Sequence, residues 1–346
     1  MRIEQLTFTR FIAAIAIVIF HFGKNSLLFN NEYVSFIFKQ ANVGVSYFFI
    51  LSGFVMIVAY KNQEKINFAA YIKNRLARIY PVYLLGILLI LSDSFFKNVN
   101  ISDLLLSIFM IQSWIPQKAL AINSPAWSLS VELFFYITFP FLINSVYNKL
   151  KLKNNAYWII LFWLISQIVF HLITHNNLQI PYYTIKDIHY NPFMHFNEFL
   201  IGNLAGLFFM DKLKNKQKNY LPYILLAILS LIVLFKFPIG LNFHNGLLAL
   251  IFVPLVLLIS LTNDKITKVF TNNKFVFLGE ISFGIYILQF PVWILFSDYR
   301  MEKYFALGKE SDATSSFVIR LFILIILSSL SYMYIEKPLR NKIKKL

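Results

Sequence analysis

The sequence predicts an all-α integral membrane protein with about ten transmembrane helices. Of its 346 residues, 58% are hydrophobic and only 14% are charged, and the mean hydropathy is +0.64. This composition is too apolar for a soluble domain and is typical of a chain that crosses a bilayer many times. The net charge of +16 agrees with basic loops on the cytoplasmic side of a membrane, so it does not require nucleic acid. We therefore expect membrane lipids, and no nucleic acid, among the partners.

Apolar stretches mark the individual spans, because a helix needs about 20 residues to cross a bilayer. The segment 101–114 is shorter and polar at its ends, so we expect it to lie in the interface or to re-enter the membrane without crossing. The ten expected spans are 8–22, 41–60, 77–92, 125–146, 156–174, 192–210, 220–236, 243–261, 275–297 and 316–335.

Basic residues predict the orientation of these spans. With a cytoplasmic N-terminus, 22 of the 32 lysines and arginines fall on the cytoplasmic side, as the positive-inside rule requires. Both termini are then cytoplasmic. No small-residue cleavage site follows the first span, so we expect it to be retained. The loops are short, and we expect residues 1–346 to form one transmembrane domain with no fused extracytoplasmic hydrolase-like domain. Pro338 is expected to end the last helix.

Arg10 and His21 are the most informative pair in the first span. They are eleven residues apart, so they share one face of a helix and lie about 16 Å apart along its axis. Arg10 then lies near the cytoplasmic surface, and His21 lies near mid-membrane or beyond. The pair lines a channel in one interpretation. In the other, Arg10 binds lipid phosphate and His21 bonds a neighbouring helix.

Two further clusters carry charge into the membrane. Arg75 and Arg78 share a helix face, and their guanidinium groups suit phosphate oxygens, although an ordinary basic anchor is the alternative. Trp127 suits an interfacial position, and Glu132 follows five residues deeper. A carboxylate there needs a partner. His21 is one candidate, which would make it a general base held by Glu132; Arg320 is the other.

Weaker signals complete the set of candidate residues. His195 and Glu198 are three residues apart, and they either contact an acceptor or form a structural pair. Gly53, Gly202 and Gly206 are expected at close helix contacts. The chain has no cysteine, which excludes disulfides and thiolate zinc sites, and we expect no metal.

Seven stretches together resemble the acyltransferase family 3 of integral membrane acyltransferases. In two places the sequence departs from the family pattern: Asn74 replaces a basic residue found in some members, and Leu133 replaces a second acid. The matching stretches are R-(ten residues)-H at Arg10 and His21, GVSYFFILSGF at 44–54, RLARIYP at 75–81, SPAWSLSVELFFY at 124–136, NPFMHFNEFLIGNLAG at 191–206, LGEISFGIYILQFPV at 278–292 and SYMYIEKPLR at 331–340.

The resemblance implies a membrane O-acetyltransferase in the bacterial inner membrane. It implies cytoplasmic acetyl-coenzyme A as the donor substrate and no permanently bound cofactor. The acceptor is expected to be a hydroxyl of a lipid-linked or cell-surface polysaccharide, as in lipopolysaccharide. His21 and Glu132 match the catalytic positions, and Arg10, Arg75 and Arg78 match those that meet the coenzyme. Direct transfer and an acyl-enzyme relay both remain open.

The alternative function is a transporter or flippase of lipid-linked oligosaccharide, but the sequence shows no repeated halves.

Six further residues are candidates for contacts with the acceptor or with the oxyanion of the reaction. They are Tyr80, Asn123, Trp127, Ser130, His195 and Glu198.

Overall fold

The computed structural model describes residues 3–93, 99–263, 269–307 and 313–345, and these residues contain helices and no strand. Both the α-helices and the short 3₁₀ or π-helical turns are needed to follow the chain. Their bounds are α1 Gln5–Phe22, α2 Ser35–Phe38, η1 Ala41–Val43, α3 Gly44–Tyr60, α4 Phe68–Leu91, α5 Ile101–Ile108, η3 Gln112–Trp114, η4 Ser124–Ala126, α6 Trp127–Leu142, η5 Ile143–Tyr147, α7 Leu152–Thr174, α8 Ile185–Tyr190, α9 Phe196–Phe208, η6 Phe209–Leu213, α10 Leu221–Lys236, α11 Ala249–Leu261, α13 Asn273–Leu295, α14 Asp298–Phe305, α15 Ala313–Ser331, η8 Tyr332–Glu336 and α16 Lys337–Lys345.

Every span expected from the sequence contains a helix, and the chain is a multi-pass membrane protein. Among the described residues, seven helical stretches are long and apolar enough to cross a bilayer. The expected spans 192–210, 220–236 and 243–261 contain the shorter helices α9, α10 and α11. We call the side of the protein where α1 begins the near side, and the side where it ends the far side.

The segment 101–114 forms one short helix and a turn. The helix α5 has eight residues, which is too few to cross a bilayer. The chain then turns at Met110, whose φ is 55°, and continues into η3. The hydroxyl groups of Tyr80 and Tyr83 donate to the carbonyl oxygens of Ile108 and Ser107, so α5 is fastened to α4.

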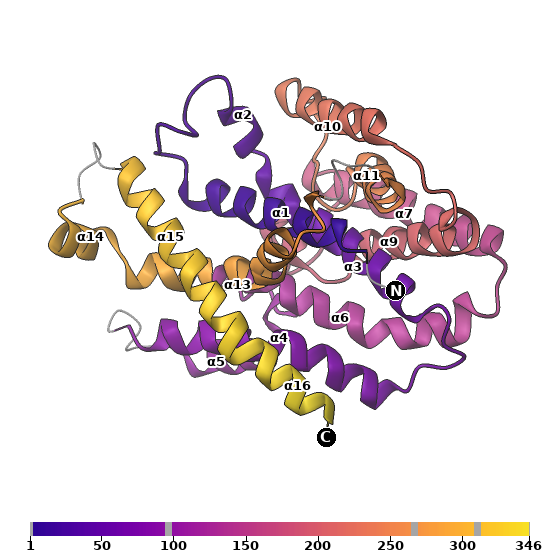
Figure 1. The fold of residues 1–346 in the computed structure, drawn as a ribbon, viewed down its shortest axis with the longest axis horizontal. Helices are drawn as coiled ribbons and strands as arrows, with labels where there is room; N and C mark the ends of the chain where they lie inside the picture. The colour runs from indigo at the N-terminus through magenta and orange to yellow at the C-terminus, as the bar shows by residue number, and fades with distance from the viewer. Residues whose placement is uncertain (1–2, 94–98, 264–268, 308–312, 346) are drawn as a thin grey trace.

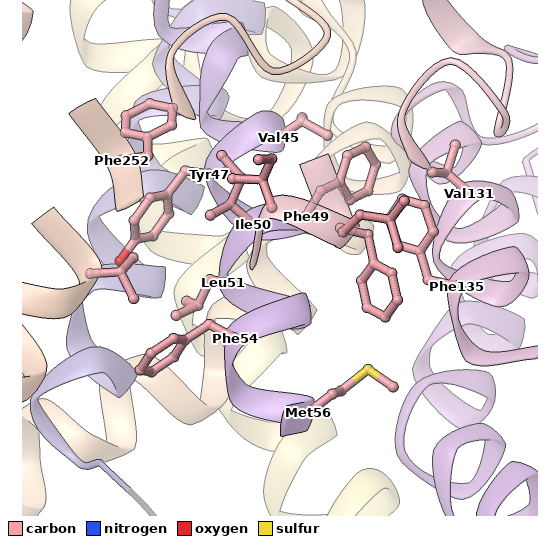
Figure 2. Packing of buried hydrophobic residues seen from close by; sticks show 14 of the residues in the cluster. Val45, Tyr47, Phe49, Ile50, Leu51, Phe54, Met56, Val131, Phe135 and Phe252 are labelled. Atoms are coloured by element: carbon pink, nitrogen blue, oxygen red, sulfur yellow. The ribbon is translucent and has the colours of Figure 1, made fainter. Parts of the chain in front are cut away.

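The helices α3 and α9 cross at glycines, as the sequence predicts. A Cβ atom on Gly53 would lie 2.2 Å from the carbonyl oxygen of Phe199, and one on Gly202 would lie 2.1 Å from that of Ile50. The two backbones therefore touch where no side chain intervenes. Figure 2 shows Phe49 and Phe54 of α3 in the core around this crossing, with Phe135 of α6 and Phe252 of α11 beside them.

A second core joins α1, α13 and α15. The helix α15 continues through the π-helical turn η8 into α16, and together they run diagonally across the front of Figure 1. The prediction that Pro338 ends the last helix is wrong. Pro338 is the second residue of α16, directly after the π-helical turn η8, and the chain stays helical through it. The helix α16 then packs against α4, on the near side.

Candidate functional site

A cavity of about 120 Å³ lies between α1, α3, α4, α6 and α13 and gathers most of the charged residues singled out in the sequence. Its lining combines three arginines and one glutamate with hydroxyl groups and an apolar wall. The lining residues are Arg10, Val45, Phe48, Phe49, Leu51, Ser52, Val55, Met56, Arg75, Arg78, Ile79, Ser128, Leu129, Glu132, Tyr136, Ser282, Phe283 and Tyr286.

The start of α4 places two of the arginines. The Asn67 side chain accepts a hydrogen bond from the Ala70 N–H, 3.0 Å away, and so caps the first turn of α4. Arg75 and Arg78 follow in the next two turns, and both line the cavity. Arg10 reaches the same cavity from α1 and interacts electrostatically with Arg78.

Aromatic rings hold the Arg75 guanidinium in place. It lies over the rings of Tyr60, Tyr71 and Tyr136, with 5.2, 5.4 and 5.9 Å between the guanidinium carbon and the ring centroids. Its Nη2 also donates to the Tyr60 hydroxyl at 2.8 Å. Its Nε is buried and has no hydrogen-bond partner among the described residues. Arg75 is therefore fixed in direction while part of its donor capacity is unused.

Glu132 is paired within its own helix. The Tyr136 hydroxyl, one turn further along α6, donates to Glu132 Oε1. Glu132 also interacts electrostatically with Arg10, which stands in the same cavity. Arg320, the other partner considered for this carboxylate, binds Asp298 instead, with 2.6 Å between Nη2 and Oδ1.

The structure does not bring His21 to Glu132. His21 is exposed at the far end of α1, packs edge-on against Phe20 and does not line the cavity. Arg10 does line it, and the eleven residues between Arg10 and His21 correspond to about 16 Å along the helix. Arg10 and His21 lie on the same helix, but Glu132 lines the cavity together with Arg10.

The other acceptor or oxyanion candidates on α4 and around α6 do not line this cavity. Tyr80 faces α5, as described above. The Asn123 Nδ2 donates to the Ile287 carbonyl oxygen at 3.1 Å, and the Ser130 hydroxyl accepts from the Ser113 N–H. Trp127, expected at the membrane interface, is only 7% exposed because it packs inside the protein.

His195 and Glu198 form a buried pair. Nδ1 of His195 lies 2.7 Å from Oε2 of Glu198, and the two residues are 2% and 0% exposed. The His195 Nε2–H donates to the His189 carbonyl oxygen at 2.8 Å. With one proton shared between the two side chains the pair has no net charge, so burying it costs less free energy than burying an isolated charge. This geometry favours the structural interpretation over contact with an acceptor.

A polar cluster that the sequence did not reveal surrounds the loop between α10 and α11. The Asn42 side-chain N–H donates to Nε2 of His244, and the Asn242 side-chain N–H donates to Nε2 of His189 at 3.1 Å. Because an amide N–H can only donate, Nε2 of each of these histidines acts as a hydrogen-bond acceptor.

Sequence reasoning also missed several residues of the cavity itself. Ser128 and Tyr136 flank Glu132 at intervals of four residues, and all three line the cavity. That spacing is the signal that would have placed them on one helix face. Ser282 and Tyr286, on α13, show the same interval. No group of three histidine, aspartate or glutamate side chains in the described ranges is arranged to hold a metal ion.

Comparisons with known proteins identify acyltransferases as relatives of this chain. A family model described as an acyltransferase domain matches residues 3–335. O-acetyltransferase OatA of Staphylococcus aureus is 24% identical over 96% of this chain and 56% of its own length. Acyltransferase MdmB of Streptomyces mycarofaciens is 30% identical over 40% of this chain and 39% of its own length. No solved structure matches.

The share of each chain that a match covers determines what the match shows. The chain spans about half the length of the curated relatives it matches. The family model, in contrast, covers α1 through α15 and most of η8, and it includes every residue that lines the 120 Å³ cavity. The chain therefore belongs to this acyltransferase family.

Proposed function

We propose that the chain is a membrane O-acyltransferase that transfers an acetyl group from acetyl-coenzyme A to a saccharide hydroxyl. The observation that carries the proposal is the cavity in which Arg10, Arg75 and Arg78 surround the Glu132–Tyr136 pair. Guanidinium groups bind phosphate oxygens well, and the donor carries several phosphates. The names of the relatives, O-acetyltransferase and acyltransferase, support the acyl-transfer chemistry.

The two substrates approach from opposite sides in this proposal. The donor enters from the near side, which is the cytoplasmic side in this proposal because most basic residues of the expected loops lie there. The membrane is the bacterial inner membrane in this proposal. The acceptor, a lipid-linked or surface polysaccharide, approaches from the far side, where α1 ends. The acyltransferase family match and the names of the relatives favour acyl transfer over transport of a lipid-linked oligosaccharide.

His21 is the proposed general base. It removes the proton from the acceptor hydroxyl, whose oxygen attacks the thioester carbonyl carbon. The carbon–sulfur bond breaks, the thiolate leaves, and the proton from His21 returns to sulfur. Because His21 lies about 16 Å along α1 from Arg10, the pantetheine arm must carry the thioester toward the far side. The proposed role of Glu132 is to balance the arginine charges beside the donor.

Thioester consumption by the purified protein in lipid nanodiscs tests the proposal. The wild type, His21→Ala and Arg78→Ala are compared, with binding of radiolabelled acetyl-coenzyme A measured in the same samples. We expect the wild type to bind and consume the donor. His21→Ala should bind it without transfer, and Arg78→Ala should bind it more weakly.

The binding measurement keeps the two parts of the proposal separate. A wild-type protein that is folded but does not bind acetyl-coenzyme A would overturn the donor assignment and favour the transporter. A His21→Ala variant that turns over at the wild-type rate would remove His21 from the reaction and leave the donor assignment intact.

A further inference from the structure

A second cavity, of about 400 Å³, adjoins the first on the near side. It is lined by Tyr60, Asn74, Arg75, Arg78 and Arg340. Arg75 and Arg78 line both cavities, so the second forms the mouth of the first. No carboxylate lines the mouth, whereas Glu132 lines the inner cavity. The mouth therefore favours an anion with several negative charges.

Arg340 comes from a helix distant in the sequence. It lies on α16, which packs against α4, so its guanidinium faces the mouth beside Arg75 and Arg78. Figure 1 shows α16 at the end of the long helical diagonal, next to α4. The π-helical turn η8 connects α15 to α16. Such turns often occur at functional sites.

Residues of the same turn lie close to Arg340. Tyr332 interacts electrostatically with both Arg340 and Glu280. The buried Glu336 interacts electrostatically with both Arg78 and Arg340. These neighbours hold the guanidinium groups of α4 and α16 close together despite their like charge, and a bound anion would compensate that charge further.

An unused donor on Arg75, which lines the mouth, points to a ligand. Arg75 Nε is buried and unpartnered in the described chain, although its Nη2 is engaged with Tyr60. A buried guanidinium N–H without an acceptor is costly, and a phosphate oxygen would satisfy it. The mouth thus offers positive charge and an unsatisfied donor in one place.

We propose that Arg340 is the third arginine of a phosphate-binding site in the mouth, and that this site takes the nucleotide diphosphate part of the donor. The proposal rests on the proposed function. The pantetheine arm then extends past Arg78 into the narrower inner cavity, whose wall is largely apolar. Arg340 thereby makes the protein select a nucleotide-linked thioester over the same thioester without phosphate.

Two donors separate this role from a general structural one. Acetyl-coenzyme A and S-acetylpantetheine share the thioester arm, but only the first has phosphates. Equilibrium binding and turnover of both are measured in nanodiscs for the wild type, Arg340→Ala, Arg340→Gln and the control Lys342→Ala. Lys342 is exposed on the same helix and lines neither cavity.

We expect Arg340→Ala and Arg340→Gln to weaken acetyl-coenzyme A binding about 10- to 100-fold, the usual effect of losing one charge-assisted hydrogen bond. Binding of S-acetylpantetheine to these two variants should not change. The control Lys342→Ala should bind both donors as the wild type does. Melting temperatures of all variants show which are folded, and the glutamine variant retains a long polar side chain if alanine unfolds the protein.

Three outcomes would overturn the proposal. Unchanged acetyl-coenzyme A binding in both Arg340 variants would remove Arg340 from the site while leaving the proposed function standing. An equal loss with both donors would show that Arg340 acts on the thioester arm or on the fold. A folded wild type that binds neither donor would show that the proposed function itself has failed.

Discussion

Tyr136 connects the opposite charges of the inner cavity, because its hydroxyl donates to Glu132 while its ring lies against Arg75. Replacing Tyr136 with phenylalanine keeps the ring and removes the donor. A hydrogen bond to a charged group contributes about 1.5–3 kcal/mol. We therefore expect turnover of acetyl-coenzyme A to fall about 10- to 100-fold, measured as thioester consumption in nanodiscs.

Tyr80→Phe is the matched control for this experiment. Its hydroxyl also donates one hydrogen bond, to the Ile108 carbonyl oxygen, but Tyr80 lies outside the cavity. Turnover should stay within about twofold of the wild type, since only the contact between α4 and α5 is weakened. Equal losses in the two variants would show that the Glu132 contact has no special role.

At the scale of the helices, the contact between α3 and α9 depends on the absence of side chains. A methyl group on Gly202 would overlap the Ile50 carbonyl oxygen at 2.1 Å, and backbone cannot move aside as a flexible side chain can. We expect Gly202→Ala to destabilise the protein by about 1–3 kcal/mol or more. The measurement is the melting temperature in detergent, together with the folded yield.

Gly284→Ala provides the comparison on α13. There the nearest atom to a new methyl group is the Ser328 Cβ at 3.1 Å, a milder contact with a side chain. Its melting temperature should fall less than that of Gly202→Ala. Similar losses would show that any alanine at a helix contact is equally harmful, and that the crossing has no special tightness.

For the molecule as a whole, features that depend on one helix were predictable from the sequence. Hydropathy located a helix in each expected span, and the spacing of Arg75 and Arg78 placed both on one face toward the cavity. Relations between helices were harder. Pairing His21 with Glu132 required their relative depths, and these depend on where each helix begins and how the helices pack.

Partners that come from elsewhere in the fold could not be read from local patterns. Arg320 binds Asp298 on the short helix α14, which hydropathy does not reveal. Trp127 is buried because Phe49 of α3 and His195, just before α9, pack against its ring, although its position in the sequence suits an interface. Arg340 reaches the mouth because the chain stays helical through Pro338.

The number of crossings and their orientation can be tested directly, because the chain has no cysteine and any introduced one is unique. Single cysteines are placed at four exposed positions between helices: Gln63, Asn177, Lys216 and Ile239. A membrane-impermeant maleimide is added to intact spheroplasts, in which only the inner membrane separates the reagent from the cytoplasm. The labelling is repeated after that membrane has been permeabilised. Ten crossings with a cytoplasmic N-terminus predict labelling of positions 177 and 239 in intact cells, and of positions 63 and 216 only after permeabilisation. If position 239 behaves like position 216, α10 does not cross; if all four are reversed, the donor side is wrong, and the basic loops do not set the orientation of this protein.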